Sequence, residues 1–162
     1  MRKNLRPILI VSAAVLLVAA LAVGGLAGFT YWSDQQAEQA RTHSVEAART
    51  TVQAMFTYDF NNVDTELPKS ADNLTPDFRK DYLKLVNEVI AKGAKEKQLT
   101  VKANTQAAGV VSADRSHAVV LLYLNQITTS KDSPQGAITP SRVRVTMDKQ
   151  DGRWLASQVT PI

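Results

Sequence analysis

The feature that most constrains this chain is an apolar run of 22 residues, Ile8–Phe29, which contains no charged side chain. As a helix the run would reach about 33 Å, at a rise of about 1.5 Å per residue. This length matches a hydrocarbon core of roughly 30 Å. The sequence therefore predicts a transmembrane helix over 8–29, which leaves about 130 of the 162 residues for one domain of ordinary size.

Charged and aromatic residues at the two ends of this run predict its orientation. Three basic residues lie in the short segment 1–7, whereas Tyr31 and Trp32 follow the run. Basic residues stay on the cytoplasmic side and aromatic residues favour the headgroup zone. We therefore expect a single-pass plasma-membrane protein with a cytoplasmic amino terminus and an extracytoplasmic domain at 33–162. A cleaved signal peptide is the alternative, but its apolar core would span only about 7 to 15 residues.

Small residues recur at steps of four on one face of the predicted membrane helix. They are Ala20, Gly24 and Gly28. Such a face lets a second helix approach closely, so these residues are candidates for helix packing in a homo- or hetero-oligomer. Ten of the 22 residues of the run are Ala, Gly or Ser, so this spacing also arises readily by chance.

The charge balance argues against nucleic acid as a partner. The chain has 19 Lys and Arg against 15 Asp and Glu, but three of the positive charges belong to segment 1–7. The remainder is nearly neutral and offers no basic surface for DNA or RNA. The chain has no cysteine, which removes disulfides, thiolate catalysis and cysteine-based zinc sites.

Two amphipathic patterns predict helices at about 34–58 and 76–92. The second begins with Thr75-Pro76-Asp77, residues suited to a helix start, and Gly93 is expected to end it. The predicted buried stripe of this second helix consists of Phe78, Tyr82, Leu85, Val86, Val89 and Ile90.

After Gln98 the pattern changes to extended segments. Alternating or continuous apolar residues predict four strands, at about 98–111, 117–128, 139–148 and 153–160. Hairpin-length turns join the first two and the last two strands. A polar segment with Pro and Gly, 128–140, separates the second and third strands and predicts a mobile loop. Helices followed by an antiparallel meander predict an α+β domain, with helices packed on one face of a four-stranded sheet and Trp154 in its core.

The stretch TYDFNNVDTEL, 57–67, is the most distinctive polar segment. A calcium loop of the EF-hand type would need an oxygen ligand where Val63 stands and glycine where Asp64 stands. We therefore interpret the stretch as a helix corner with turn-forming Asn and Asp residues. If the domain holds a cavity, the candidate lining residues are Tyr58, Asp59, Asp64, Tyr82 and Tyr123.

Catalytic and metal-binding patterns are missing from the sequence. The predicted strands carry no ionisable general base on their apolar face, and the nearest acids, Asp59, Asp64 and Asp81, come from the helical part. His43 and His117 stand apart from any other histidine. No G-x-S-x-G elbow and no glycine-rich phosphate loop occurs. We expect a protein that is not an enzyme and that has no cofactor and no metal.

Several segments occur along the whole chain in a recognisable order. A basic start and one apolar span precede YDF, NNVD, LTPDF, VVLLYLNQ and a terminal DGRWLASQV. In this order they resemble the Mce-associated membrane proteins of actinobacteria, mycobacteria especially. The resemblance implies a cone-like domain of the nuclear transport factor 2-like or cystatin-like type. It also implies a non-enzymatic accessory subunit that supports or stabilises an Mce-type lipid import complex, with Mce transporter subunits and the lipid bilayer as partners.

Two other functions fit the same plan. Inner-membrane components of type IV secretion systems combine one amino-terminal span with a cone-like exported domain and act as assembly scaffolds. A membrane-tethered carrier or isomerase for a small apolar ligand in the cone is the other alternative.

Overall fold

The computed structural model describes residues 36–162. Segment 1–7, the predicted membrane helix at 8–29 and its candidate packing residues lie outside this range; those residues are Ala20, Gly24 and Gly28. Within 36–162, no helix combines the length and the apolar character that a bilayer crossing requires. Gln39–Ile162 form one compact unit.

The unit places helices before strands, as the sequence predicts. A helix whose described residues are 36–56 is followed by β1 (Tyr58–Asp59) and by α2 (Val63–Ser70), η1 (Ala71–Asn73), α3 (Pro76–Leu85), η2 (Val86–Ile90) and α4 (Ala91–Lys97). The long strands come last: β2 (Thr100–Ala113), β3 (His117–Ser130), β4 (Ser133–Gln150) and β5 (Arg153–Pro161). The strands form an antiparallel sheet in the order β1-β2-β3-β4-β5. The predicted α+β class is confirmed, with a fifth strand because the two-residue β1 pairs with β2.

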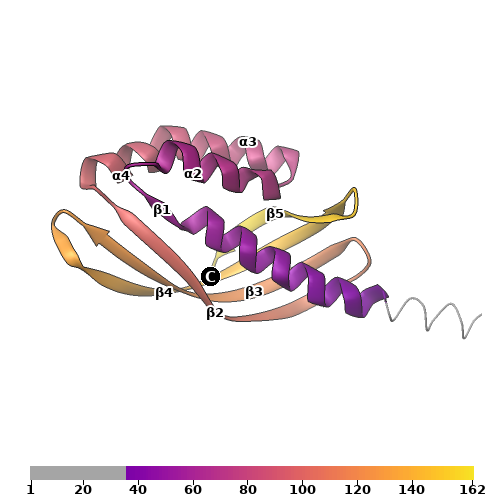
Figure 1. Cartoon of the computed structure of the whole chain (residues 1–162). Helices are drawn as coiled ribbons and strands as arrows, with labels where there is room; N and C mark the ends of the chain where they lie inside the picture. The colour runs from indigo at the N-terminus through magenta and orange to yellow at the C-terminus, as the bar shows by residue number, and fades with distance from the viewer. Residues whose placement is uncertain (1–35) are drawn as a thin grey trace, which may run out of the picture. The chain divides into compact units, whose positions relative to one another are not determined.

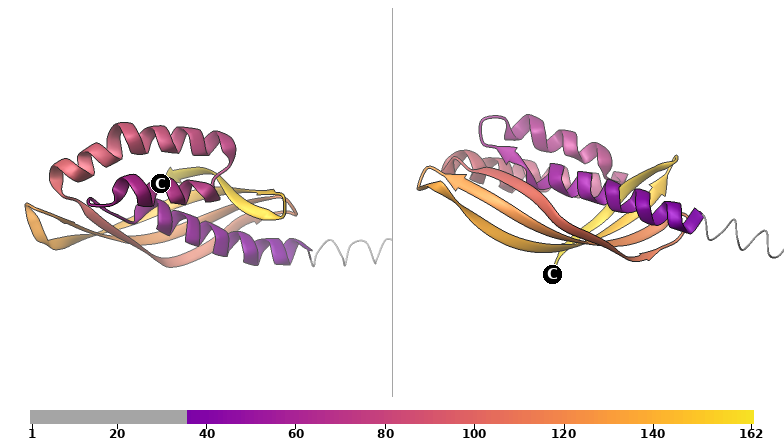
Figure 2. Two further views of the ribbon diagram at one scale, coloured as in Figure 1. Left: turned by 45° about the horizontal axis from the view of Figure 1, so that its top comes forward. Right: turned by 60° about the horizontal axis from the view of Figure 1, so that its bottom comes forward.

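The helices and the sheet form two layers. Figure 1 shows α2, α3 and α4 together over one face of a curled sheet. In the right-hand view of Figure 2 the far face of β3 and β4 comes forward, and no described helix covers it. One face of the sheet is therefore packed, and the other faces outward.

Alternation along the central strands builds the core. Ala118, Val120, Leu122 and Leu124 of β3 are at most 1% exposed, whereas Tyr123 between them is 44% exposed. Successive side chains of a strand point to opposite faces, so the inward residues pack beneath the helices. In β4 the same inward set is Val143, Val145 and Met147. Trp154 of β5 is buried as predicted.

The stretch 57–67, which we interpreted as a helix corner, includes the start of a helix that the sequence pattern does not predict. α2 spans Val63–Ser70 and buries Val63, Leu67 and Ser70. Only two of its eight residues are large aliphatic side chains, and Pro68 lies inside it. A pattern this short, with a proline that lacks an N–H donor, gives too weak a periodic signal to predict.

The second predicted helix is longer and less regular than expected. It continues through η2, a π-helical turn, and ends at Lys97, where Gln98 adopts a left-handed conformation with φ of 52°. Gly93 does not end it and stays within α4. The π-helical turn inserts a residue into the helical repeat. Leu85 and Val89 are exposed, at 48% and 59%, instead of lying in the buried stripe.

The predicted mobile loop at 128–140 is instead a paired hairpin. Thr128 pairs with Ala137 and Ser130 with Ser133, so strand structure continues on both sides of a tight turn. The strand β5 pairs with β4 only from Val143 onward. The first half of β4 is therefore a free edge, where prolines are tolerated because no neighbour needs their N–H groups. Pro and Gly in this segment led to the wrong prediction of a loop.

Gly136 in this hairpin has a conformation that favours glycine, and its replacement tests the hairpin. Its φ is +78°, and a Cβ atom there would lie 3.1 Å from Thr129 Cγ2. Gly136→Ala is expected to lower the free energy of unfolding by about 1 to 3 kcal/mol, measured by urea unfolding. The control is Gly93→Ala, which meets open space in a helix and should gain about 0.5 to 1 kcal/mol. Equal stability of the two variants would contradict the described hairpin.

Candidate functional site

A pocket lies between the helical layer and the sheet. Its volume is about 480 Å³, within the roughly 300 to 1,000 Å³ typical of small-molecule sites. Helix 36–56, β1, α3, η2 and strands β2, β3 and β5 all contribute to its lining, which is mostly apolar. Its apolar residues include Met55, Phe56, Phe78, Leu85, Ile90 and Val101.

Tyr82 joins three helical segments at the wall of this pocket. Its side chain is buried, and its hydroxyl donates to the Met55 carbonyl oxygen at 3.3 Å. The Ser70 hydroxyl lies 3.0 Å from the Tyr82 hydroxyl and 2.7 Å from the Leu67 carbonyl oxygen. Burial raises the pKa of Tyr82 above its ordinary value, so this phenol stays neutral at physiological pH. The Tyr82 hydroxyl is thus used in holding the helices together.

Three further polar residues line the pocket. Tyr58 is half-buried on β1, and burial raises the pKa of its phenol. Gln126 follows Leu122 and Leu124 in the inward phase of β3, which directs it toward the helices. Asp81 lies exposed on α3 and makes no ion pair among the described residues.

The five predicted cavity residues are divided by the fold. Tyr58 and Tyr82 line the pocket, whereas Asp59, Asp64 and Tyr123 do not. Asp64 forms an ion pair with Lys95 at the surface. Tyr123 lies in the outward phase of β3, where the guanidinium of Arg142 stands 5.7 Å from its ring centre. Gln126 was not predicted to line a cavity, because a polar residue near the end of an apolar strand is usually exposed to solvent. Its position two residues after Leu124 and four after Leu122, on the same face of the strand, could have indicated that it points inward.

Asp59 stabilises the turn after β1 instead of facing the pocket. Its Oδ1 accepts the Asn61 backbone N–H at 2.9 Å, and its Oδ2 accepts the Thr100 hydroxyl at 2.7 Å. These two hydrogen bonds, the backbone one foremost, hold the pKa of Asp59 below its ordinary value. The carboxylate therefore ties the first turn to β2.

The lowered pKa of Asp59 predicts a dependence of stability on pH. A depressed folded-state pKa adds stability above the unfolded value of about 3.9, and this contribution is lost as pH falls through the folded value. Asp59→Asn should therefore have a lower Tm than the wild type at neutral pH. The deficit should shrink below about pH 4, as measured by thermal unfolding across the acid range. A deficit that stays constant with pH would contradict this role of the carboxylate.

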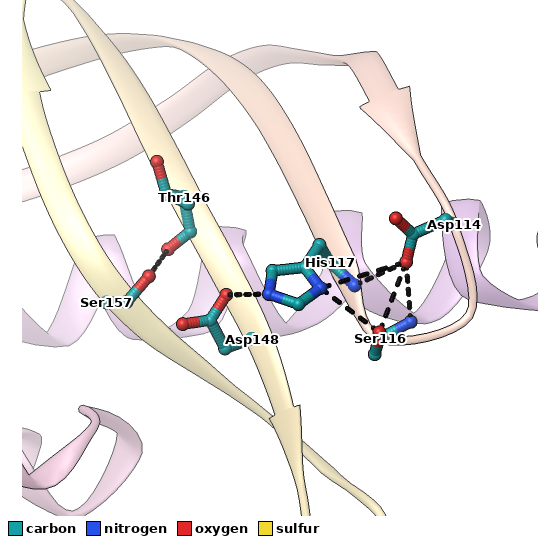
Figure 3. Close-up of polar contacts among 6 residues, drawn as sticks. All are labelled: Asp114, Ser116, His117, Thr146, Asp148 and Ser157. Atoms are coloured by element: carbon teal, nitrogen blue, oxygen red, sulfur yellow. Dashed lines mark hydrogen bonds and ion pairs between the residues drawn. The ribbon is translucent and has the colours of Figure 1, made fainter.

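A second polar cluster lies at the β2–β3 turn (Figure 3). The Ser116 hydroxyl is 3.1 Å from His117 Nδ1, and His117 Nε2 is 3.6 Å from Asp148 Oδ1. The order Ser, His, Asp resembles a catalytic triad, but 3.6 Å exceeds a hydrogen bond, and the His117 side chain is 67% exposed. The same view shows the Ser157 hydroxyl donating to the Thr146 carbonyl oxygen between β4 and β5.

Asp114 explains why this cluster forms. Its Oδ1 accepts the backbone N–H groups of Ser116 and His117, both at 2.8 Å. These bonds hold the pKa of Asp114 below its ordinary value. They also close the turn, because the carboxylate takes the place that a backbone carbonyl oxygen has in an ordinary turn. We interpret the cluster as a turn cap. Within residues 36–162, no group of three or more His, Cys, Asp or Glu side chains could hold a metal ion.

The domain shares its fold with solved periplasmic domains. It matches the periplasmic domain of DotI with a TM-score of 0.63 and 18% identity, over 73% of this chain and 91% of that one. It matches an IcmL-like type IV secretion system protein from Legionella pneumophila with a TM-score of 0.61 and 16% identity, over 73% and 90%. At these identities the likeness shows the fold alone, and the cone-like, nuclear transport factor 2-like type stays an expectation from the sequence.

Sequence comparison finds mycobacterial relatives. Outer membrane protein Rv1973 of Mycobacterium tuberculosis is 41% identical over 147 residues, which cover 88% of this chain and 91% of the relative. Uncharacterized protein Rv1362c of the same organism is 32% identical over 163 residues, which cover 100% and 74%. The expected mycobacterial kinship is confirmed, although these names do not mention Mce. The family described as "Uncharacterized protein Rv1363c/MT1408-like" matches residues 7–162, and the chain belongs to this family.

Proposed function

We propose that the chain is a non-enzymatic scaffold subunit of a membrane complex in the mycobacterial envelope. The observation that carries the proposal is the shared fold, which extends over about nine-tenths of the periplasmic domain of DotI and of an IcmL-like type IV secretion system protein. The uncharged run at 8–29 supports it, because a single span followed by such a domain suits a subunit that holds others at the membrane. The absence of an enzymatic role is part of this proposal.

The outward face of the sheet offers a surface suited to a partner. Ile127 of β3 pairs directly with Ile138 of β4, and their side chains are 37% and 68% exposed. Tyr123 pairs with Arg142 on the same face. We call these four residues the outer patch. Exposed apolar residues grouped with Tyr and Arg are typical of protein interfaces.

Two kinds of complex are candidates for this subunit. The fold comparison favours a secretion-like assembly. The sequence resemblance to Mce-associated proteins favours a lipid importer instead. We propose that the protein spans the plasma membrane once, with its domain outside the cytoplasm. The relative Rv1973 is named an outer membrane protein, so separating the inner and outer membranes and locating the protein in one of them tests this proposal.

Affinity purification of the full chain from native membranes tests the scaffold function. Wild type should recover a defined set of membrane proteins, and deletion of the gene should lower their abundance. Ile138→Asp should lose these proteins at unchanged Tm, whereas the control Val89→Asp, also largely exposed but on the helical layer, should keep them. Partners of unchanged abundance in the deletion strain would contradict scaffolding. Secretion or Mce subunits among those recovered would identify the complex.

A further inference from the structure

We propose that the pocket between the helical layer and the sheet binds one uncharged, lipid-like molecule, whose hydroxyl or carbonyl group contacts Gln126 and Tyr58. This binding site would be an addition to the scaffold function and does not depend on it. The size, the unused polar groups, the charge and the local helix geometry of the pocket each support the proposal.

The volume of the pocket sets the size of the ligand. An engineered cavity of about 150 Å³ holds one benzene molecule, so a pocket of about 480 Å³ has room for roughly three such volumes. This corresponds to roughly 15 to 20 carbon atoms. The aromatic and aliphatic walls, with Phe56, Phe78 and Ile90 among them, favour a hydrocarbon body over a polar metabolite.

Two polar side chains of the pocket are available to a ligand. The Tyr82 hydroxyl is already bonded to Met55 and lies beside Ser70. By contrast, the Gln126 amide and the Tyr58 hydroxyl make no hydrogen bond with any described residue, although both line the pocket. Both groups remain accessible to solvent, since neither is a buried atom without a hydrogen-bond partner. A ligand hydroxyl or carbonyl group would take the place of water as their hydrogen-bond partner.

The charge of the lining selects against fatty acids. Asp81 is the charged residue among those that line the pocket, and no Lys, Arg or His accompanies it there. A ligand carboxylate would therefore add a second negative charge without a cation to balance it. An alcohol, an ester or a sterol-like molecule meets no such repulsion.

The π-helical turn provides independent support. η2 spans Val86–Ile90. Leu85, which directly precedes it, and Ile90, its last residue, both line the pocket. Such turns within regular helices occur frequently at functional sites. Here Leu85, directly before the turn, is 48% exposed and lines the pocket.

Photolabelling of the full chain in detergent micelles tests this site. The probes are hexadecanol and hexadecanoic acid, each with one diazirine at the same carbon. We expect the alcohol to label peptides of α3 and η2 about three- to tenfold more than the acid, and excess unlabelled hexadecanol to compete. Leu85→Trp should fill the pocket and abolish most of this labelling. The matched control Val89→Trp, exposed on the same helix but outside the lining, should label like wild type.

Two polar variants test the chemistry of the ligand. Gln126→Leu should reduce labelling by the alcohol, and Asp81→Asn should raise labelling by the acid toward that of the alcohol. Equal labelling of wild type by both probes would overturn the preference for an uncharged ligand. Undiminished labelling of Leu85→Trp, or labels confined to outward residues of the sheet, would overturn the pocket as the site. Thermal unfolding of each variant verifies that the fold is retained.

Discussion

Trp154→Ala is expected to lower the free energy of unfolding by about 3 to 5 kcal/mol, which is typical of a large aromatic residue removed from a core. Trp154 is 8% exposed in β5 and lines a cavity of about 260 Å³ together with Ala47 and Thr51 of helix 36–56. The ammonium group of Lys149 stands 5.8 Å from its ring centre. Truncation would leave a cavity between strand and helix that the surrounding backbone cannot close.

Urea unfolding of the wild type and of two variants measures this effect. The control is Leu155→Ala, the next residue along β5, which is only partly buried and should cost less than half as much. A loss for Trp154→Ala below about 0.5 kcal/mol, the range of surface substitutions, would mean that Trp154 is not part of the core in solution.

Leu67→Ala is expected to cost about 2 to 5 kcal/mol. Leu67 is fully buried in α2, and its carbonyl oxygen lies within hydrogen-bonding distance of the Ser70 hydroxyl beside Tyr82. The substitution should therefore loosen α2 and weaken the contact that holds it to α3. Protection of the α2 amides from hydrogen exchange should fall along with global stability.

The matched control for this substitution is Leu85→Ala. It removes the same atoms from a side chain that is 48% exposed, and it should cost less than about 1 kcal/mol, since little transfer free energy is lost. Similar losses for both leucines would contradict the described burial of α2.

Periodicity predicted the parts of the fold where one face is strongly apolar. The inward residues Leu122 and Leu124, and Val143 and Val145 in the neighbouring strand, are fully buried or nearly so. An almost unbroken apolar run predicted the first of these strands, and clean alternation predicted the second. α2 was missed because Val63 and Leu67 are too few to produce a period. The first half of β4 was missed because it contains proline and glycine, which disfavour a central strand but are tolerated in a strand at the edge of a sheet.

The candidate site was predicted only in part, for a different reason. Tyr58 is an aromatic residue in the short strand after the first helix, and Tyr82 belongs to the predicted buried stripe of the second helix, so both were expected to face the interior. Asp59 and Asp64 were grouped with them by proximity in sequence, but hydrogen bonds to Asn61 and Thr100 and an ion pair with Lys95 hold them elsewhere. A local sequence pattern does not indicate which of two neighbouring carboxylates finds such a partner.

The free edge in the first half of β4 bears on how closely copies of this protein can be crowded. Exposed sheet edges recruit strands from other molecules, and this route leads to aggregation. Pro134 and Pro140 remove two N–H donors from this edge, and Gly136 at φ +78° interrupts its regular extended conformation. A neighbouring copy therefore meets a broken hydrogen-bond ladder. Copies of the domain can therefore be crowded at high local density without their sheets joining from one copy to the next.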